Sequence, residues 1–299
     1  MKVSVALCTY NGEKYLSQQL ESILKQSQFA NEIIICDDNS TDSTIEILSN
    51  YKNQYPSIIK IFRNEVNVGY IKNFEKAINL CSYDLIFLSD QDDIWSNNKI
   101  QKVRDFAENN PDYNIFSHKV KLLKENVEII ESPFWKGSNF NEDFNNTEVL
   151  QYLLFERNVF PGMTLIITQD AKKNYLPFKN VHPVIIHDYE LVLKSCRDEK
   201  FAIIPEALSL YRIHENQSIG LNSQGEHKSE KEIIYNKIKR IYFVVNAVHQ
   251  LNLNPKLITE YKEKCRHDYK KFIKNIKFPK NLIMSLKFKY YYKILDDII

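Results

Sequence analysis

The sequence predicts an α/β protein in which a mostly parallel, doubly wound sheet is followed by a helical C-terminal appendage. Through the first 110 residues, short apolar runs alternate with segments of helical periodicity. Polar clusters follow three of the apolar runs directly, and the residues beyond 230 have helical spacing without a strand pattern. Strands that alternate with helices connect through right-handed crossovers, which makes the strands parallel and places helices on both faces of the sheet.

The first half of the chain carries the clearest element signals. β-Branched apolar runs that end in polar residues indicate strands at 3–7, 33–36, 58–62 and 85–89. Apolar residues at helical spacing indicate helices at 13–27, from the polar run 37–42 to about 55, at 72–81 and at 97–108.

The pattern after residue 112 is mixed. Extended segments are expected at 114–123 and 127–131, which can pair, and at 163–168, 201–204 and 208–211. Helices are expected at 147–156, 187–196, 231–251, 255–277 and 279–299, and a flexible loop at the polar stretch 216–229. We therefore expect a domain of residues 1–225 and a basic helical C-terminal region of residues 226–299.

The composition fits a globular protein of a reducing compartment. With 43% hydrophobic and 26% charged residues, the chain can bury a large core. The five cysteines are odd in number and widely spaced, which argues against a disulfide framework and against a CxxC metal site. Because the sequence has neither a signal-peptide pattern nor an apolar run of about 18 residues, we expect a cytoplasmic location.

Charge is divided unevenly along the chain. Residues 228–299 hold 17 Lys/Arg and 7 Asp/Glu, whereas residues 1–227 hold 23 and 31, so the net charges are +10 and −8. A basic tail on an acidic body suggests an anionic partner, and lipid headgroups at the inner face of the cytoplasmic membrane are one candidate. The alternative is a helical appendage that packs on the body or forms a homo-oligomer. Nucleic acid is not expected as a partner.

Two carboxylates follow the expected strand 85–89. Asp90 and Asp92 are two residues apart, so both can face one divalent cation. Mg²⁺ and Mn²⁺ prefer oxygen ligands and keep positions open for phosphate oxygens, so such a cation can bridge a diphosphate and neutralise a leaving group. For an isolated pair the alternative is an acidic turn that caps the next helix. The strand before the pair, together with the other polar clusters, favours the metal site.

The other two clusters follow the first and second strands. Tyr10, on the first loop, can stack on a nucleobase. In the run 37–42, local turn and capping chemistry explains residues 40–42, but two adjacent acids exceed that need, and one can accept a pyrimidine N–H. Ligands of doubly wound sheets bind at the carboxyl ends of the strands, so the three clusters are expected to form one site. The GxGxxG, Walker A, HExxH and GxSxG motifs are absent.

Four of these segments resemble the family 2 glycosyltransferases, which have the GT-A fold, a Rossmann-like α/β architecture. Residues 3–12 (VSVALCTYNG) are similar to the opening of that family, 37–44 (DDNSTDST) to its second signature and 67–69 (NVG) to its third. Residues 89–95 (SDQDDIW) resemble the subgroup often described as rhamnosyltransferases.

Later pieces of the same subgroup are PGMT at 161–164, the pair His187-Asp188, and LYRIH at 210–214. The resemblance spans roughly residues 1–220. His187 stands where the wider family has an acidic residue. The processive QxxRW motif is absent, which implies transfer of a single sugar.

The resemblance implies an inverting, metal-dependent transfer in cell-surface polysaccharide synthesis. Asp188 takes the place of the base that removes the acceptor proton as the hydroxyl attacks. Asp92 is the implied metal ligand, with Asp90 beside it, and His214 is a further candidate ligand for Mn²⁺ or Mg²⁺. In the implied donor site, Tyr10 stacks on the base and Asp38 holds its ring N–H.

Other predicted donor contacts are near the ribose and diphosphate or within the same clusters. They are Thr9, Asn11, Gly69, Lys72, Asp90 and Gln91. The implied partners are a dTDP- or UDP-sugar, with rhamnose, another deoxysugar or a hexose as the sugar, and a saccharide acceptor that can be lipid-linked.

Two other functions stay open at this point. A nucleotidyltransferase also uses paired acids at strand ends, but it needs a loop rich in Gly, Arg or Lys after the first strand, and residues 9–14 make a poor one. A non-catalytic nucleotide-sugar-binding protein is disfavoured because Asp38, Asp92 and Asp188 occur together.

Overall fold

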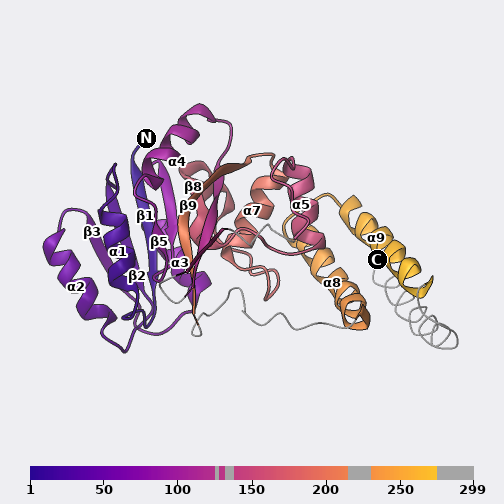
Figure 1. The fold of residues 1–299 in the computed structure, drawn as a ribbon, viewed down its shortest axis with the longest axis horizontal. Coiled ribbons are helices and arrows are strands. Elements are labelled where there is room, and N and C mark those ends of the chain that lie inside the picture. Colours follow the sequence, from indigo (N-terminus) through magenta and orange to yellow (C-terminus); the bar gives the residue numbers. More distant parts are fainter. Residues whose placement is uncertain (125–127, 132–137, 215–229, 275–299) are drawn as a thin grey trace. The chain divides into compact units, whose positions relative to one another are not determined.

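The computed structural model of the chain describes residues 1–124, 128–131, 138–214 and 230–274 (Figure 1). The chain divides into two compact units. One comprises Met1–Leu153 and Asn158–Leu221, and the other comprises Leu154–Arg157 and Asn222–Ile299. The expected loop 216–229 and helix 279–299 lie outside the described residues.

The first half of the sheet is parallel, as the alternating pattern predicts. Its strands are β1 (Val3–Thr9), β2 (Glu32–Asp37), β3 (Ile59–Arg63) and β4 (Leu85–Ser89), in the order β3-β2-β1-β4. The intervening and following helices are α1 (Leu16–Leu24), α2 (Thr44–Gln54), α3 (Tyr70–Leu80) and α4 (Lys99–Asn109). In Figure 1 these four strands lie side by side in indigo and purple. The strand positions agree with the predicted ones to within about two residues.

The second half of the sheet is mixed, and here the expectation of a mostly parallel sheet is wrong. Its strands are β5 (Ile94–Trp95), β6 (Ile115–Lys124), β7 (Glu128–Glu131), β8 (Leu165–Thr168) and β9 (Phe201–Ile213). The sheet continues β4-β8-β6-β9-β5, with β7 on β6. Among the described residues of this half, β6 and β9 pair in parallel and the other pairs are antiparallel. The expected pairing of 114–123 with 127–131 is confirmed as the β6–β7 ladder.

Three short elements of the described residues were not predicted, and one strand was divided wrongly. The unpredicted elements are the two-residue strand β5, the 3-10 turn η1 (Gly162–Thr164) and the helix α6 (Gln169–Tyr175). The segments 201–204 and 208–211 are one strand, β9, whose register against β6 shifts between His118 and Val120. Pro205 lies at this irregularity, and proline has no N–H to donate to a ladder, which explains the interrupted pattern.

Helices cover both faces of the parallel half. The core cluster joins Val5 and Leu7 of β1 to Leu20 of α1 and Val103 of α4. Alternate residues of a strand face opposite sides, so the other face of β1 is the one that α3 covers. The remaining helices are α5 (Asn146–Phe155) and α7 (His187–Arg197), with a short 3-10 turn, η1, at Gly162–Thr164. Because both faces are covered, the strand ends form the accessible edge.

The second unit is helical in its described part, as predicted. It contains α8 (Glu230–Gln250) and α9 (Lys256–Lys274), which pack on each other. Tyr261 of α9 packs its ring 5.1 Å from that of Phe155, and Arg240 donates from Nε to the Leu154 carbonyl at 2.7 Å. Among the helices of the described residues, none is long and apolar enough to span a membrane.

Candidate active site

The carboxyl ends of β1, β2 and β4 lie together at one edge of the sheet. Leu7 of β1 is in register with Ser89 at the end of β4, and Thr9 is in register with Asp37 at the end of β2. The three polar clusters that the sequence placed after these strands therefore share one edge, as the fold requires.

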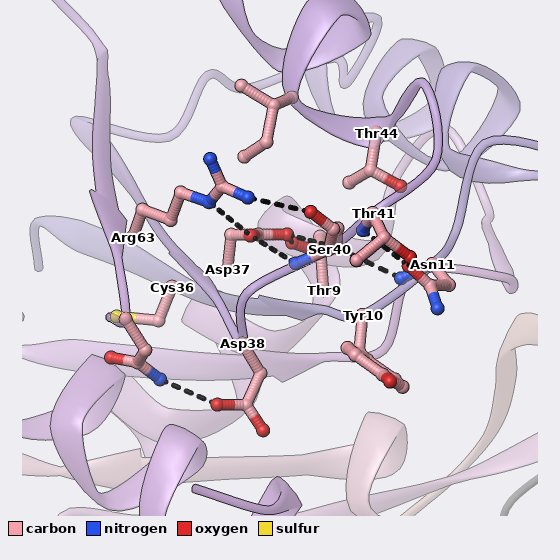
Figure 2. A network of polar contacts seen from close by, with 12 residues as sticks. Thr9, Tyr10, Asn11, Cys36, Asp37, Asp38, Ser40, Thr41, Thr44 and Arg63 are labelled. Carbon is pink, nitrogen blue, oxygen red and sulfur yellow. Dashed lines mark hydrogen bonds and ion pairs between the residues drawn. The ribbon is translucent and has the colours of Figure 1, made fainter. Parts of the chain in front are cut away.

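Side chains of the second cluster hold the loop that follows β1 (Figure 2). The Asn11 N–H donates to Ser40 Oγ at 2.9 Å, and the Gly12 N–H donates to Thr44 Oγ1 at 2.8 Å. In the opposite direction, the Thr41 N–H donates to Asn11 Oδ1 at 2.8 Å. Residues 40–44 thus do more than cap their own helix, because they also bind the backbone of the first loop.

The two adjacent acids of the second cluster have different surroundings. Asp37 is fully buried and accepts hydrogen bonds from Thr9 Oγ1 and from the Ser40 N–H, both at 2.9 Å. Arg63 pairs with the same carboxylate, at 3.7 Å from its Nε. Asp37 therefore has a structural role. The hydroxyl of Thr9, a residue predicted to contact the nucleotide-sugar, is hydrogen-bonded to Asp37.

The Asp38 carboxylate organises the loop between β3 and α3. Its Oδ1 accepts from Asn64 Nδ2 and from the Val68 N–H, and its Oδ2 accepts from the Gly69 N–H, all at 2.8 Å. A carboxylate has about four acceptor positions, so these bonds leave room on Oδ2 for one more donor. Gly69 has a φ of +84°, which side chains disfavour, and this explains a glycine at the start of α3.

The acidic turn after β4 is tied to the first loop by Gln91. Its Oε1 accepts from the Tyr10 N–H at 2.8 Å, and its Nε2 donates to the Tyr10 carbonyl at 3.0 Å. A Cβ at Gly12 would lie 2.3 Å from Gln91 Oε1, so the glycine makes room for this amide. The Tyr10 side chain remains 47% exposed.

The acidic turn is also tied to the end of β9. His214 Nε2 lies 2.8 Å from Asp92 Oδ2. The buried Arg212 donates from Nε to the Asp92 carbonyl at 2.7 Å, and its N–H donates to Asp93 Oδ1 at 3.1 Å. The sequence pairs Asp92 and His214 as candidate metal ligands, and the structure brings them together across 122 positions of the chain.

Asp90 interacts electrostatically with two other carboxylates, those of Asp92 and Asp188. Burial, followed by the negative charges of Asp92 and Asp188, raises the pKa of Asp90 to about 8. Lys99 lies fully buried nearby and donates from Nζ to the Met163 carbonyl at 3.0 Å. Burial lowers the pKa of Lys99 well below its usual value, and the charges of Asp93 and Asp90 oppose that shift.

Asp188 stands in the first turn of α7 and is only 5% exposed. Burial raises its pKa to about 7, although hydrogen bonds from the Tyr189 and Gly162 N–H groups favour the ionised form. The neighbouring His187 is also buried, and neither ring nitrogen has a hydrogen-bond partner in the described part of the chain. Burial lowers the pKa of His187 to about 3, so its ring is neutral.

Lys72 lies in the first turn of α3 with a half-exposed side chain. Its Nζ pairs with Glu75 Oε1 at 2.8 Å. Glu75 Oε2 in turn accepts from the Phe178 N–H at 2.7 Å. A ligand phosphate at Lys72 would therefore compete with an exposed ion pair, which is weak.

The donor set suits a hard divalent cation. Within the described ranges, no group of three or more His, Cys, Asp and Glu side chains is arranged to hold a metal. Asp92 and His214 lie together and offer two ligands, and Asp90 lies in the same turn as Asp92. Mg²⁺-type ions in phosphate-transfer sites take one or two carboxylates and complete their shell with water and substrate phosphates, so these residues fit such an ion.

Several supporting residues were not identified from the sequence. Asn64 follows β3 as the other polar clusters follow their strands, so its position was a usable signal. Arg212 lies inside the LYRIH segment, between recognised positions. Lys99 gave no signal, because a lysine at the start of a helix normally faces solvent.

Comparison with known proteins agrees with the geometry. The family model described as "Glycosyl transferase family 2" matches residues 4–165, and the chain belongs to that family. It is therefore a glycosyltransferase that uses a nucleotide-sugar donor.

Individual relatives are similar over most of the chain. The dTDP-rhamnosyl transferase RfbG of Shigella flexneri is 31% identical over 255 residues, which are 81% of this chain and 84% of the relative. The UDP-Glc:alpha-D-GlcNAc-diphosphoundecaprenol beta-1,3-glucosyltransferase WfgD of Escherichia coli is 26% identical over 253 residues, or 82% and 92%. The crystal structure of S. aureus TarS 1-349 in complex with UDP has the same fold, with a TM-score of 0.58 and 18% identity over 93% of this chain and 76% of TarS.

Proposed function

We propose that this glycosyltransferase moves one deoxyhexose or hexose from a dTDP- or UDP-sugar to a hydroxyl of a saccharide acceptor, with inversion. The observation that carries the proposal is a juxtaposition at one sheet edge. Asp188 lies against Gly162 of η1, and η1 packs on β4, whose end leads into Asp90 and Asp92. The names of RfbG and WfgD support a deoxyhexose or hexose donor, and the GlcNAc-diphosphoundecaprenol in the name of WfgD supports a saccharide acceptor.

The proposed roles follow from each residue's surroundings. Asp188 accepts the proton of the attacking hydroxyl, because its pKa of about 7 suits a base that works near neutral pH. The remaining acceptor position on Asp38 Oδ2 suits a pyrimidine ring N–H, and the exposed ring of Tyr10 can stack on the same base. Thr9, Asn11 and Gln91 act mainly by fixing the loop that carries Tyr10.

We further propose that Asp92, Asp90 and His214 hold Mn²⁺ or Mg²⁺ together with the donor diphosphate. The family generally uses a divalent metal. When bound, such an ion supplies neutralisation of the charge that develops on the departing nucleoside diphosphate. The family resemblance assigns Gly69 and Lys72, at the start of α3, to the neighbourhood of the ribose and diphosphate.

The deciding experiment is a donor panel. The purified chain is incubated with dTDP-rhamnose, UDP-glucose, UDP-N-acetylglucosamine and GDP-mannose, with Mn²⁺ or Mg²⁺, and released nucleoside diphosphate is measured. We expect release from a dTDP- or UDP-sugar and none after chelation. Failure to bind or cleave any donor would overturn the proposal, and release of pyrophosphate from a nucleoside triphosphate would indicate a nucleotidyltransferase instead.

We also propose that the enzyme works at the inner face of the cytoplasmic membrane, with residues 226–299 outside the catalytic domain and in contact with lipid. The support is the net charge of +10 on residues 228–299 and the lipid-linked acceptor in the name of WfgD. Each basic residue near an anionic surface contributes about 1 kcal/mol, and salt screens the attraction. Binding to vesicles of anionic phospholipid at low salt, lost at high salt, is the expected result. No binding at low salt would favour the homo-oligomer alternative.

A further inference from the structure

An aromatic cluster surrounds His187, the residue before the proposed base. The ring of Phe74 stacks on the His187 ring with centroids 4.3 Å apart and an interplanar angle of 18°. The rings of Tyr70 and Phe178 lie at 6.2 Å each, both tilted. Phe74, Phe178 and His187 are buried, whereas Tyr70 is 40% exposed. Of these four residues, Tyr70 is thus the one whose side chain is exposed to solvent.

The position of Tyr70 is fixed from two sides. It is the first residue of α3, directly after Gly69, whose N–H is held by Asp38. Its ring meets a neutral imidazole that makes no hydrogen bond in the described structure, so the contact is an apolar one. An exposed tyrosine on a free loop would be mobile, but this ring has a rigid support.

Tyr70 also lies close to the proposed base. Helix α3 packs on α7, which begins at His187 and Asp188. Burial, followed by the negative charge of Asp188, raises the pKa of Tyr70. The ring of Tyr70 contacts His187, the residue next to Asp188, so an acceptor whose hydroxyl is within hydrogen-bond distance of Asp188 would lie near this ring.

We infer that the exposed ring of Tyr70 is a stacking platform for the acceptor sugar, built on the His187–Phe74 stack and placed beside Asp188. This inference rests on the proposed function. A pyranose has an apolar face of C–H groups that packs on an aromatic ring, while its hydroxyls remain free for Asp188. The sugar contacts the ring of Tyr70 and not its hydroxyl, so the Tyr70→Phe variant should bind the sugar as well as the wild type does.

The test measures sugar binding directly. Saturation-transfer NMR is recorded with the full chain, dTDP or UDP, and Mg²⁺, on the methyl α-glycosides of rhamnose, glucose, galactose and N-acetylglucosamine. Four proteins are compared: wild type, Tyr70→Ala, Tyr70→Phe and Tyr55→Ala. Tyr55 is 38% exposed, similar to Tyr70, but it follows α2 before β3 begins, at the opposite ends of the strands from the site. Circular dichroism melts confirm that each variant is folded.

We expect saturation transfer to at least one glycoside in wild type, a loss of affinity of about fivefold in Tyr70→Ala, and near-wild-type values in Tyr70→Phe and Tyr55→Ala. Calorimetric Kd values for dTDP and UDP should stay within about twofold in all four proteins, because Tyr70 contacts the acceptor and not the nucleotide. Unchanged glycoside binding in Tyr70→Ala would overturn the platform. An equal loss in Tyr70→Phe, or no glycoside binding to wild type, would do the same.

This experiment distinguishes a failure of the proposed nucleotide-sugar donor from a failure of the proposed Tyr70 platform. If neither nucleotide binds wild type but glycosides depend on Tyr70, the donor assignment fails and the platform stands. If nucleotides bind and glycosides do not depend on Tyr70, the platform alone is wrong.

Discussion

The side-chain amide of Gln91 hydrogen-bonds both main-chain groups of Tyr10, as donor to the carbonyl and as acceptor from the N–H. The same amide fills the space beside Gly12 that a Cβ would occupy. One side chain therefore connects the acidic turn after β4 to the loop that carries the proposed base-stacking ring.

Gly12→Ala and Gln91→Ala should weaken donor binding through the same loop. A methyl group at residue 12 would displace the Gln91 amide, and truncation of Gln91 removes both bonds. Each change should raise the Kd for the nucleotide by about tenfold, at 0.5–1.5 kcal/mol for each lost bond. Because both act on one contact, the double variant should bind about as well as either single variant. Calorimetry measures this, and fully additive losses would show that the two residues act independently.

Asp188 should set the pH dependence of catalysis. Its folded pKa of about 7 lies above the ordinary 3.8, so the ionised base is lost as the pH falls below about 7. The value of kcat/KM should rise with pH up to about 7 and then level off. Asp188→Asn should lower turnover by about 10²-fold or more and abolish the rise of kcat/KM with pH, with the nucleotide Kd little changed. If kcat/KM of the variant still rises with pH, another group is responsible for the rise.

The same pKa shift predicts a gain in stability from Asp188→Asn. An acid whose folded pKa is raised is protonated in the folded state after the unfolded chain has lost its proton, so the wild type loses stability as pH rises from about 4 to about 7. The Asp188→Asn variant has no ionisable group at this position, so its stability does not fall in this way. Its melting temperature should exceed that of wild type by about 2 °C or more near pH 8 and by nothing near pH 3. Equal melting temperatures at both pH values would mean that Asp188 is not desolvated.

His214 should determine how much metal the enzyme needs. It is hydrogen-bonded to Asp92 and can reach the same cation. His214→Ala should raise the Mn²⁺ concentration for half-maximal donor cleavage by about tenfold, whereas Asp92→Ala should abolish cleavage. Isothermal titration of Mn²⁺ with the nucleotide present tests binding apart from turnover. A His214→Ala enzyme with unchanged metal affinity would leave this histidine a purely structural role.

Lys99 should matter for stability in spite of its position at a helix start. Lys99→Met removes the buried amino group that donates to the Met163 carbonyl and to Ser209 Oγ, so both acceptors lose a partner, and it should cost about 3 kcal/mol in the free energy of unfolding, measured with urea. Lys102→Met is the matched control on the same helix. Lys102 pairs with Glu206 at 3.2 Å with both side chains more than 40% exposed, so its loss should cost less than about 1 kcal/mol. Equal effects would contradict the structural role of Lys99.

The sequence predicts the parallel half of the sheet well because each of its strands is a continuous apolar run with a polar stop. The second half is less predictable for physical reasons. The ladder partner of β8 is fixed by tertiary packing, and a two-residue strand such as Ile94–Trp95 has no period to detect. The proline in β9 breaks the pattern of a strand that nevertheless continues.

At the site, residue types and strand ends were enough to bring together Asp38, Asp92 and Tyr10. The different roles of adjacent residues could not be predicted from the sequence. Asp37 and Asp38 look equivalent in the sequence, but strand alternation turns one toward Thr9 and the other toward the loop at Gly69. Burial decides the pKa of Asp188, and no local pattern reports burial at a single position.

The bonds between the first two loops constrain how their lengths can change. Five main-chain N–H groups of these loops, those of Asn11, Gly12, Glu13, Thr41 and Ser43, each donate to a side chain of the other loop about 30 positions away. Surface loops usually tolerate an added or deleted residue, but here such a change would shift every later donor past its acceptor. The two segments therefore behave as a fixed-length part of the framework, and engineering for other nucleotides has to proceed by side-chain substitution and not by loop grafting.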